Sequence, residues 1–383
     1  MKERISIIGA IGALVLAAAL GGPALAGPRA NTTQVGSLLI FPKITVDPAD
    51  SPGSSNTLIE ISNDQSAPVH IKCWYVNERK GRVDFNFDLS SKQTASWEVL
   101  TGTGDIAAPL FPSDAPFPGP GNIFKGELIC FAVDAGAQNQ IAWNHLVGTA
   151  TVVSSGDADA TQPHQAHRYN AFAFMARATV GQPADGTIQG VPGQLVLSGN
   201  GDGTYDACPV YNIANFMPGG GPPLNDVSTI DNDLVVVSCK QDLRQDFVLH
   251  TTKLDFKVWN AHENSFTGSY LCVDSVASFA IGTSGGNVSP VKNPTNFDFS
   301  TLQTRNARFT VQGIFSSVCD PTIFGTTEPT GLLAVLQSSV RINGDVNESQ
   351  ELGSTTFAAG YDRTGFVTWN PHGPALSSKK PKR

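Results

Sequence analysis

Short segments in which apolar and polar residues alternate recur along most of the chain. Clear examples are residues 69–76, 84–89, 127–133, 148–153 and 169–174. Alternation with a period of two is typical of strands that bury one face, and the clusters of Gly, Pro, Asn and Asp between these segments predict turns. Many short strands at this spacing predict an all-β fold built of antiparallel β-sandwiches.

Two segments far apart in the chain are similar to each other. Residues 86–94 read NFDLSSKQT and residues 296–304 read NFDFSTLQT, with six of nine positions identical. An alternating segment and a cysteine precede each copy: residues 58–61 with Cys73, and residues 254–258 with Cys272. Such self-similarity predicts two structurally related units, each with its own core.

The expected fold is therefore two tandem antiparallel immunoglobulin-like β-sandwiches. We expect a signal peptide at 1–26, a first domain at 27–240, a second domain at 241–375 and a basic disordered tail at 376–383. The first domain carries a long C-terminal extension with a hairpin between Cys208 and Cys239. This hairpin could instead belong to neither unit and brace the junction between them.

The first residues carry the features of a secretory signal. Lys2 and Arg4 form a basic start, residues 5–20 are apolar, and residues 24–26 (Ala-Leu-Ala) match a signal peptidase site, so we expect the mature chain to begin at Gly27. A membrane anchor is the alternative, but the apolar run is short. We expect no transmembrane segment in the mature chain and a location outside the cell, on its surface or in the periplasm.

All six cysteines lie in the mature part of the chain. An even number in an exported protein favours disulfides over free thiols, although six cysteines allow about 15 connectivities. A zinc site is disfavoured because no C-x-x-C pair occurs. Pairing between neighbours in the sequence is the favoured arrangement: Cys73–Cys130, Cys208–Cys239 and Cys272–Cys319.

The charge of the chain argues against nucleic acid as a partner. The formal net charge is −8, and it becomes −9 without Lys2, Glu3 and Arg4, which together contribute +1. An acidic surface keeps an exported protein soluble and repels a polyanion. Residues 377–383 form a basic stretch, which we interpret as a solvated end or as a segment that contacts an anionic surface.

Four further segments carry a resemblance to other proteins. They are residues 36–43 (GSLLIFPK), 126–134 (GELICFAVD), 143–148 (WNHLVG) and 266–272 (FTGSYLC). Together they resemble a group of uncharacterised secreted proteobacterial proteins with paired all-β, immunoglobulin-like units. The resemblance covers most of the mature chain and implies export and an all-β fold. It implies no activity, cofactor or site residue.

Two motifs suggest chemistry that their surroundings do not support. Residues 282–286 match G-x-S-x-G, but a nucleophilic serine needs a strand-to-helix turn, a histidine and an acid, and the prolines that follow favour a simple loop. His164 and His167 form H-x-x-H, which binds metal on a helix. Here the preceding Pro163 favours a loop. We interpret His145 as a structural histidine.

Other residues allow a binding role. The acidic loops at 200–206 and 343–351 could hold calcium, but neither has the spacing of an EF-hand, and hydrated turns are the default. The tryptophans could stack on carbohydrate, although packing in a sandwich core is the favoured interpretation. They are Trp74, Trp97, Trp143, Trp259 and Trp369.

These observations favour an exported, non-catalytic binding or structural protein at the cell surface or outside the cell. We predict no catalytic, cofactor-binding or metal-binding residues, and a cell-surface protein or a glycan is the expected partner. One alternative is a secreted hydrolase of polysaccharide that uses Asp134 or Glu127. Another is a subunit that assembles by strand addition, with residues 38–41 as an exposed edge strand.

Overall fold

The computed structural model describes most of two β-sandwich units. The signal peptide expected at 1–26 and the tail at 376–383 lie outside the described residues. The described residues are 29–47, 55–112, 124–137, 139–154, 165–176, 178–182, 196–197, 205–209, 211–221, 227–239, 241–242, 252–273, 276–282, 297–314, 316–317, 319, 329–343, 349–358 and 360–361.

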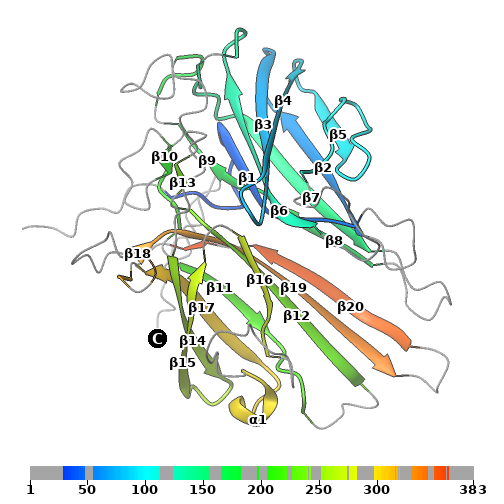
Figure 1. Ribbon diagram of the computed structural model, residues 1–383, viewed down its shortest axis with the longest axis vertical. Coiled ribbons are helices and arrows are strands. Elements are labelled where there is room, and N and C mark those ends of the chain that lie inside the picture. The colour runs from blue at the N-terminus through cyan, green and yellow to red at the C-terminus, as the bar shows by residue number, and fades with distance from the viewer. Residues whose placement is uncertain are drawn as a thin grey trace, which may run out of the picture.

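The first unit is a sandwich of two antiparallel sheets (Figure 1). The strands of sheet I follow the order β4 (Arg82–Leu89), β3 (Val69–Asn77), β6 (Phe124–Val133), β1 (Leu38–Val46) and β9 (Phe172–Phe174). Those of sheet II follow the order β5 (Thr94–Glu98), β2 (Ser55–Asn63), β7 (Leu146–Ser154) and β8 (Gln165–Asn170).

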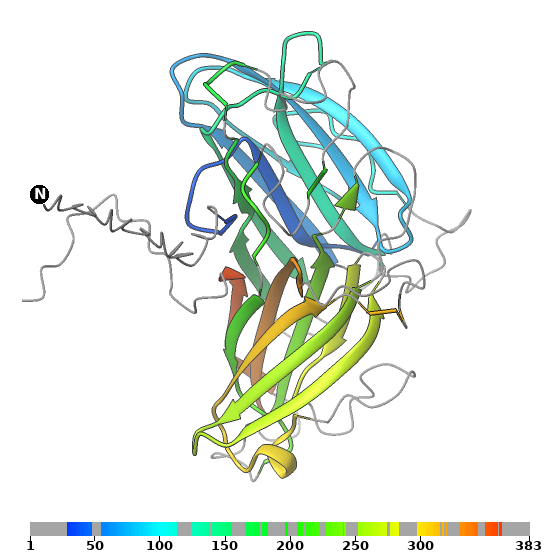
Figure 2. The same ribbon diagram turned by 90° about the vertical axis from the view of Figure 1, so that its left-hand side faces the viewer.

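The second unit is also a sandwich of two antiparallel sheets (Figure 2). The strands of sheet III follow the order β15 (Ser265–Val273), β14 (Thr252–Asn260), β17 (Ala307–Ile314), β11 (Tyr211–Phe216) and β21 (Gly360–Tyr361), and β18 (Pro329–Thr330) pairs with β17. Those of sheet IV follow the order β16 (Val276–Ala280), β12 (Val227–Ser238), β19 (Leu332–Asn343) and β20 (Ser349–Ala358).

Three short elements lie outside these sheets. The helix α1 (Phe299–Leu302) lies between β16 and β17, and Asp298 caps its N-terminus by accepting a hydrogen bond from the backbone N–H of Thr301. The strands β10 (Val196–Leu197) and β13 (Gln241–Asp242) form a small ladder of their own. The all-β, antiparallel prediction is confirmed.

Both units have the same strand order. Sheet III repeats the order of sheet I, and sheet IV repeats that of sheet II, when β1 to β9 are matched in sequence with β11, β12, β14, β15, β16, β17, β19, β20 and β21. This order differs from that of immunoglobulin constant domains, whose first two strands pair in one sheet. Here β1 and β2, like β11 and β12, lie in opposite sheets.

The similar segments 86–94 and 296–304 do not occupy matching places in this shared topology. The first runs from β4 through a turn into β5. The described part of the second, 297–304, includes the α1 helix between β16 and β17. The sequence similarity that suggested a repeat therefore does not mark equivalent positions in the two units.

The expected boundary at 240/241 is also wrong. Both β11 and β12 precede residue 240, yet β11 pairs with β17 and β12 pairs with β16 and β19. The second unit therefore begins before Tyr211. Its first two strands hold the positions that β1 and β2 hold in the first unit, and pairing with strands so distant in sequence leaves no local signal.

One asparagine holds the hairpin turn between β3 and β4. The Oδ1 atom of Asn77 accepts hydrogen bonds from the backbone N–H groups of Arg79 and Gly81, at 3.0 and 2.6 Å. Its Nδ2 atom donates to the backbone oxygen of Pro112 at 3.2 Å. Lys80, within the turn, has a φ of 68°. The buried side chain thus ties the hairpin to the loop before β6.

The matching hairpin of the second unit, between β14 and β15, has the same arrangement. The Oδ1 atom of Asn260 accepts from the N–H groups of His262 and Asn264, both at 3.0 Å. Its Nδ2 atom donates to the oxygen of Leu302 at 2.9 Å, and Glu263 has a φ of 64°. Matching Asn77 with Asn260 therefore aligns the hairpin strands of the two units residue by residue.

Each sandwich has its own core. Between sheets I and II the core includes Phe41, Ile59, Tyr75 and Leu128, and the Nε1–H of the buried Trp97 donates to the Tyr75 hydroxyl at 2.6 Å. Between sheets III and IV, the corresponding cluster contains Phe216, Leu234, Leu254, Phe256, Val258, Phe309, Val311 and Leu336. In both, alternate residues of each strand point inward, as the period of two requires.

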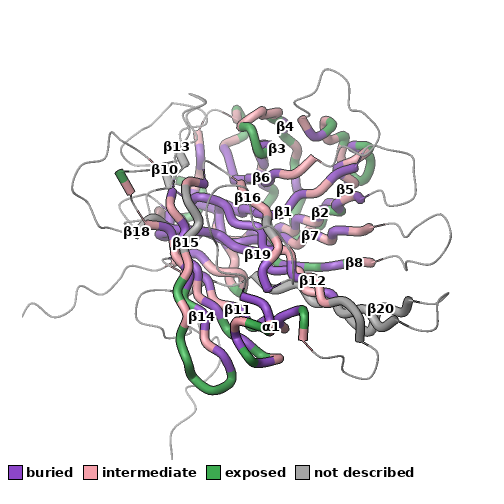
Figure 3. Tube along the Cα trace, turned by 60° about the horizontal axis from the view of Figure 1, so that its bottom comes forward, coloured by how far each residue is buried: buried purple, intermediate pink, exposed green. Residues whose placement is uncertain are grey.

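Sheet I is buried on its outer face as well. Its strands β1 and β6 are accordingly buried along most of their length (Figure 3). We call this second layer the junction cluster, because the segment before β11, the end of β12 and the start of β19 contribute to it. Its members include Leu38, Ile40, Trp74, Ile129, Phe131, Phe172, Tyr205, Cys208, Val237, Cys239 and Leu333. Burial on two faces explains why β1 is apolar without alternation at Leu38–Phe41.

Residues 38–41 are therefore not an exposed edge strand, which corrects the strand-addition alternative. Within β1, Leu38 to Ile40 pair with β6 on one side and with β9 on the other. All four side chains are fully buried.

The units also meet at β8 and β20, the end strands of sheets II and IV, which lie side by side.

Candidate functional site

The six cysteines form three disulfides, in the pairing that the sequence favoured. Cys73 and Cys130 lie directly opposite each other in β3 and β6, with Cα atoms 4.1 Å apart. This bond lies within sheet I, whereas the immunoglobulin disulfide joins two sheets. Cys208–Cys239 connects the segment before β11 to the end of β12, inside the junction cluster. Cys272–Cys319 lies in the second unit.

A charged network crosses the interface between the units. The Lys43 ammonium of β1, which is 5% exposed, lies 2.6 Å from Oδ2 of Asp233 in β12. The other carboxylate oxygen of Asp233 accepts a hydrogen bond from Ser278, whose hydroxyl also accepts from Lys125 at 3.0 Å. Each unit therefore supplies charged or polar partners to the other.

Burial sets the protonation behaviour of this network. It lowers the pKa of Lys43, although Asp233 opposes the shift. Burial also acts to raise the pKa of Asp233, but Lys43 and Lys125 and two hydrogen bonds outweigh it, so the pKa lies below its usual value. The carboxylate is therefore held in its charged form beside the two lysines.

The outer face of sheet III is a second distinctive feature, and it faces solvent. In β14, Leu254, Phe256 and Val258 point into the core, so Trp259 and Lys257 point outward. Cross-strand pairing places Arg308 beside Trp259, and Asn215 beside Arg308. We call this surface, formed by Asn215, Lys257, Trp259, Glu263, Asn306 and Arg308, the Trp259 face.

Two cations lie against the ring of Trp259, which is half-buried. The Arg308 guanidinium carbon is 4.9 Å from the ring centroid, and the Lys257 nitrogen is 5.1 Å from it. Both distances fall within the range of cation–π attraction. These contacts hold the ring and the guanidinium together on a surface that remains open to solvent.

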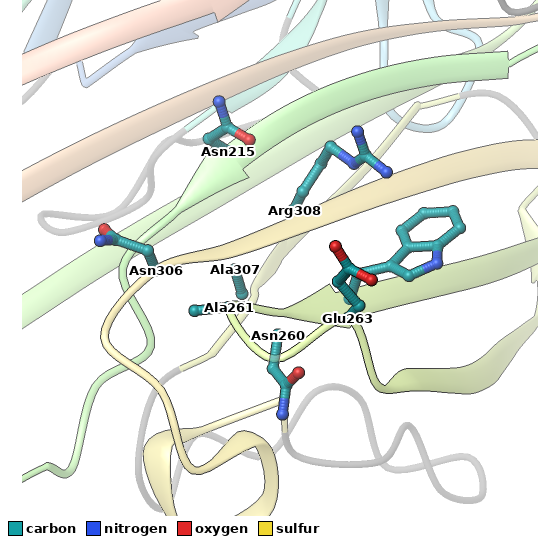
Figure 4. A pocket seen from close by; sticks show the side chains of 8 residues that line it. Asn215, Asn260, Ala261, Glu263, Asn306, Ala307 and Arg308 are labelled. Atoms are coloured by element: carbon teal, nitrogen blue, oxygen red, sulfur yellow. The ribbon is translucent and has the colours of Figure 1, made fainter.

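A cavity of about 780 Å³ opens over this surface. In Figure 4, the side chains of Glu263 and Arg308 lie on one side of it and those of Asn215 and Asn306 on the other. The cavity is lined by Asn215, Trp259, Asn260, Ala261, Glu263, Asn306, Ala307 and Arg308. One aromatic ring among charged and amide groups suits a hydrated ligand.

The sequence favoured tryptophan packing in a sandwich core, and this is confirmed for Trp97 and Trp143. Trp74 is buried in the junction cluster, Trp259 is not buried, and Trp369 lies outside the described residues. The alternation in 252–260 contains the signal that was missed. It places Trp259 on the same face as Lys253, Asp255 and Lys257, opposite the apolar residues.

The two histidines of the H-x-x-H motif do not meet at a described site. His164 lies outside the described residues, and His167 in β8 is 2% exposed. Burial, followed by the charge of Lys43, lowers the pKa of His167 to about 4. His145 is partly exposed, with Nδ1 2.7 Å from Asp64 and Nε2 3.0 Å from Gln65.

The carboxylates that a hydrolase would use lie apart. Glu127 is fully buried near the start of β6, and Asp134 follows the end of that strand, where it accepts a hydrogen bond from Asn139. Seven residues of strand correspond to about 23 Å. Paired glycosidase carboxylates lie about 5 to 9.5 Å apart, so these two do not form such a pair.

The remaining candidate loops fall largely outside the described residues. Of the G-x-S-x-G motif, only Gly282 is described, and residues 344–348 of the second acidic loop are not. In the first loop, Asp206 accepts a hydrogen bond from Gln34 at 3.0 Å. Within the described ranges, no cluster of three or more His, Cys, Asp or Glu side chains is placed to hold a metal ion.

In the part that the structure describes, no helix has the length and apolar character needed to cross a membrane. A scan against models of known protein families finds no match, and no curated protein matches the chain.

Proposed function

We propose that the protein is an exported, non-catalytic binding protein whose second unit presents the Trp259 face to a polar partner at the cell surface or outside the cell. Three disulfides support export, because such bonds persist in oxidising compartments. A rigid sandwich that positions a few exposed side chains is a common scaffold for recognition.

The half-exposed Trp259 is the observation that carries this proposal. A tryptophan on the outer face of a sheet loses the packing that a core position would give it, yet it offers a large flat surface to a ligand. Matching strands of the first unit carry Trp74 and Val76 on the same outer face, and both are buried in the junction cluster. The matching positions of the second unit are Lys257 and Trp259, and both remain accessible to solvent.

Binding to envelope material tests the proposal. We expect the oxidised mature protein, residues 27–383, to bind saturably to envelope fractions of the cells that export it. Replacing Trp259 with Ala should weaken this binding about tenfold or more, since a central aromatic contact commonly contributes that much. The matched control is Leu58→Ala, which removes a 39% exposed apolar side chain from β2 in the first unit.

The outcomes separate clearly. Tighter binding by wild type and by Leu58→Ala than by Trp259→Ala supports the proposal. Equal binding by all three proteins, or no saturable binding by the wild type, contradicts it. Because Trp259 is not part of either core, we expect each variant to retain the fold. Circular dichroism checks this.

A further inference from the structure

We infer that the Trp259 face binds an acidic oligosaccharide, with a sugar ring on Trp259 and a sugar carboxylate against Arg308. This inference rests on the proposed function and specifies its ligand. It follows from a comparison of the two matching sheet faces, from the chemistry of Arg308 and from the charge of the surrounding surface.

The two outer faces differ in chemistry although their topology is the same. On sheet I, Leu38, Ile40 and Phe131 make an apolar surface that is buried in the junction cluster. On sheet III, the four adjacent strands β11, β17, β14 and β15 carry polar or charged residues on this face, all exposed or half-buried: Asn215, Arg308, Thr310, Lys257, Ser265 and Thr267. A face with this composition is suited to a hydrated ligand and not to another apolar protein surface.

Arg308 is prepared to bind a carboxylate. Its guanidinium is held over the Trp259 ring, and its side chain is exposed on the cavity wall. A guanidinium presents five N–H donors in a planar fork that matches the two oxygens of a carboxylate. Because the contact with the ring already restricts the side chain, little further ordering is needed when a ligand binds.

The other polar groups fit the hydroxyls of a sugar. Asn215 and Asn306 each offer an amide donor and acceptor, and Glu263 offers a carboxylate acceptor. Asn260 is not available to a ligand in this way, because its amide already holds the hairpin turn. Amide and carboxylate groups around one aromatic ring provide the partners that a ring with several hydroxyls requires.

Local charge explains why an acidic ligand is favoured over a neutral one. The whole chain has a formal charge of −8. The outer face of sheet III nevertheless carries three basic side chains, Lys253, Lys257 and Arg308, against Asp255 and Glu263. Of the two acidic groups, Asp255 accepts a hydrogen bond from Gln312 at 3.4 Å. These five side chains carry a net charge of +1, and Arg308 is the basic group in the cavity lining, so the attraction for an acidic ligand comes from Arg308 itself.

Titration calorimetry with defined polymers tests the ligand class. The probes are polygalacturonate oligomers, neutral dextran oligomers and vesicles of phosphatidylglycerol. We expect the polygalacturonate oligomers to bind the mature protein more tightly than the other two. Raising NaCl from about 50 to 500 mM should weaken that binding, because the contact includes an exposed ion pair.

Three variants locate the contact. Arg308→Gln should weaken binding of the acidic oligomer about tenfold, and Arg308→Lys should lie between it and wild type, since lysine keeps the charge but loses the fork. The matched control is Arg168→Gln, which removes a 60% exposed arginine from β8 in the first unit. It should leave the affinity unchanged.

Several results would overturn the inference. They are equal affinity for dextran, unchanged affinity in Arg308→Gln, or tighter binding of the anionic vesicles. If no polymer binds while envelope material is still retained through Trp259, the ligand class is wrong and the proposed binding function stands. If neither polymers nor envelope material bind, the cation–π cluster serves only to stabilise the sheet.

Discussion

At the scale of single residues, Asn77 and Asn260 show how one buried amide can fix a hairpin. We predict that Asn77→Ala lowers the free energy of unfolding by roughly 2 to 3 kcal/mol, because it leaves backbone groups without partners. Urea denaturation measures the change. In the same turn, Lys80→Gly should be neutral or stabilising, since its φ of 68° suits glycine. A loss below about 0.5 kcal/mol for Asn77→Ala would contradict this role.

His167 predicts a pH dependence of stability. Its pKa is about 4 in the folded protein, compared with an ordinary value of 6.5. The unfolded chain therefore binds the proton more readily between these values. The stabilisation from the neutral ring is complete above pH 6.5 and is lost as the pH falls towards 4. A shift of this size corresponds to roughly 3 to 4 kcal/mol.

The variant His167→Leu should remove this part of the pH dependence. The measurement is the difference in unfolding free energy between wild type and variant at pH 7.5 and at pH 4.5. His262→Leu is the matched control, because His262 is exposed in the β14–β15 turn. Parallel curves for wild type and His167→Leu would show that the ring already titrates freely in the fold.

At the scale of elements, the disulfide between β3 and β6 joins directly opposite residues of sheet I. Its sequence separation is 57 residues, so it restricts the unfolded chain strongly. We predict that replacing Cys73 and Cys130 together with Ala lowers stability by about 2 to 4 kcal/mol. Guanidinium denaturation of the non-reduced protein measures it.

The matching positions of the second unit need no such bond. Aligning Asn77 with Asn260 matches Cys73 with Phe256 and Cys130 with Val311, which pair directly. A Cys73→Val/Cys130→Val protein should therefore recover part of the stability that the Ala pair loses, because it refills the core. Equal stability of the two double variants would contradict this view of the site.

The strands themselves were largely predictable, and their partners were not. The segments expected as strands at 69–76, 84–89, 127–133 and 148–153 are β3, β4, β6 and β7, although β3 and β6 bury residues on both faces of sheet I. Residues 169–174 were expected as a single strand, but β8 ends in sheet II and β9 begins in sheet I, with Ala171 between them. A chain that crosses between sheets keeps its local pattern, so the crossing is invisible in the sequence.

The candidate site was predictable in part. Alternation in 252–260 separates Trp259 from the core residues of the same strand. Its partner Arg308 lies almost 50 residues later and reaches it only through the pairing of β14 with β17. No local pattern records that pairing, which is why the sequence yielded an aromatic candidate without its charged neighbour.

At the scale of the whole molecule, the Lys43–Asp233 ion pair couples the two units. Asp233→Ala would leave the buried Lys43 ammonium without its closest partner, and we predict a loss of roughly 2 to 4 kcal/mol. The double variant Lys43→Met/Asp233→Ala should recover most of that loss, because it removes the buried charge. Denaturation followed by tryptophan fluorescence measures all three proteins. Strict additivity would contradict the coupling.

The most direct test of the binding surface is hydroxyl-radical footprinting of the mature protein, with and without saturating polygalacturonate oligomer. Leu110, which is 63% exposed in the first unit, serves as the internal reference. We predict that oxidation of Trp259 falls several-fold when the oligomer is bound, while oxidation of Leu110 is unchanged. Unchanged oxidation of Trp259 under saturating ligand, with protection elsewhere, would place the binding surface on another part of the molecule.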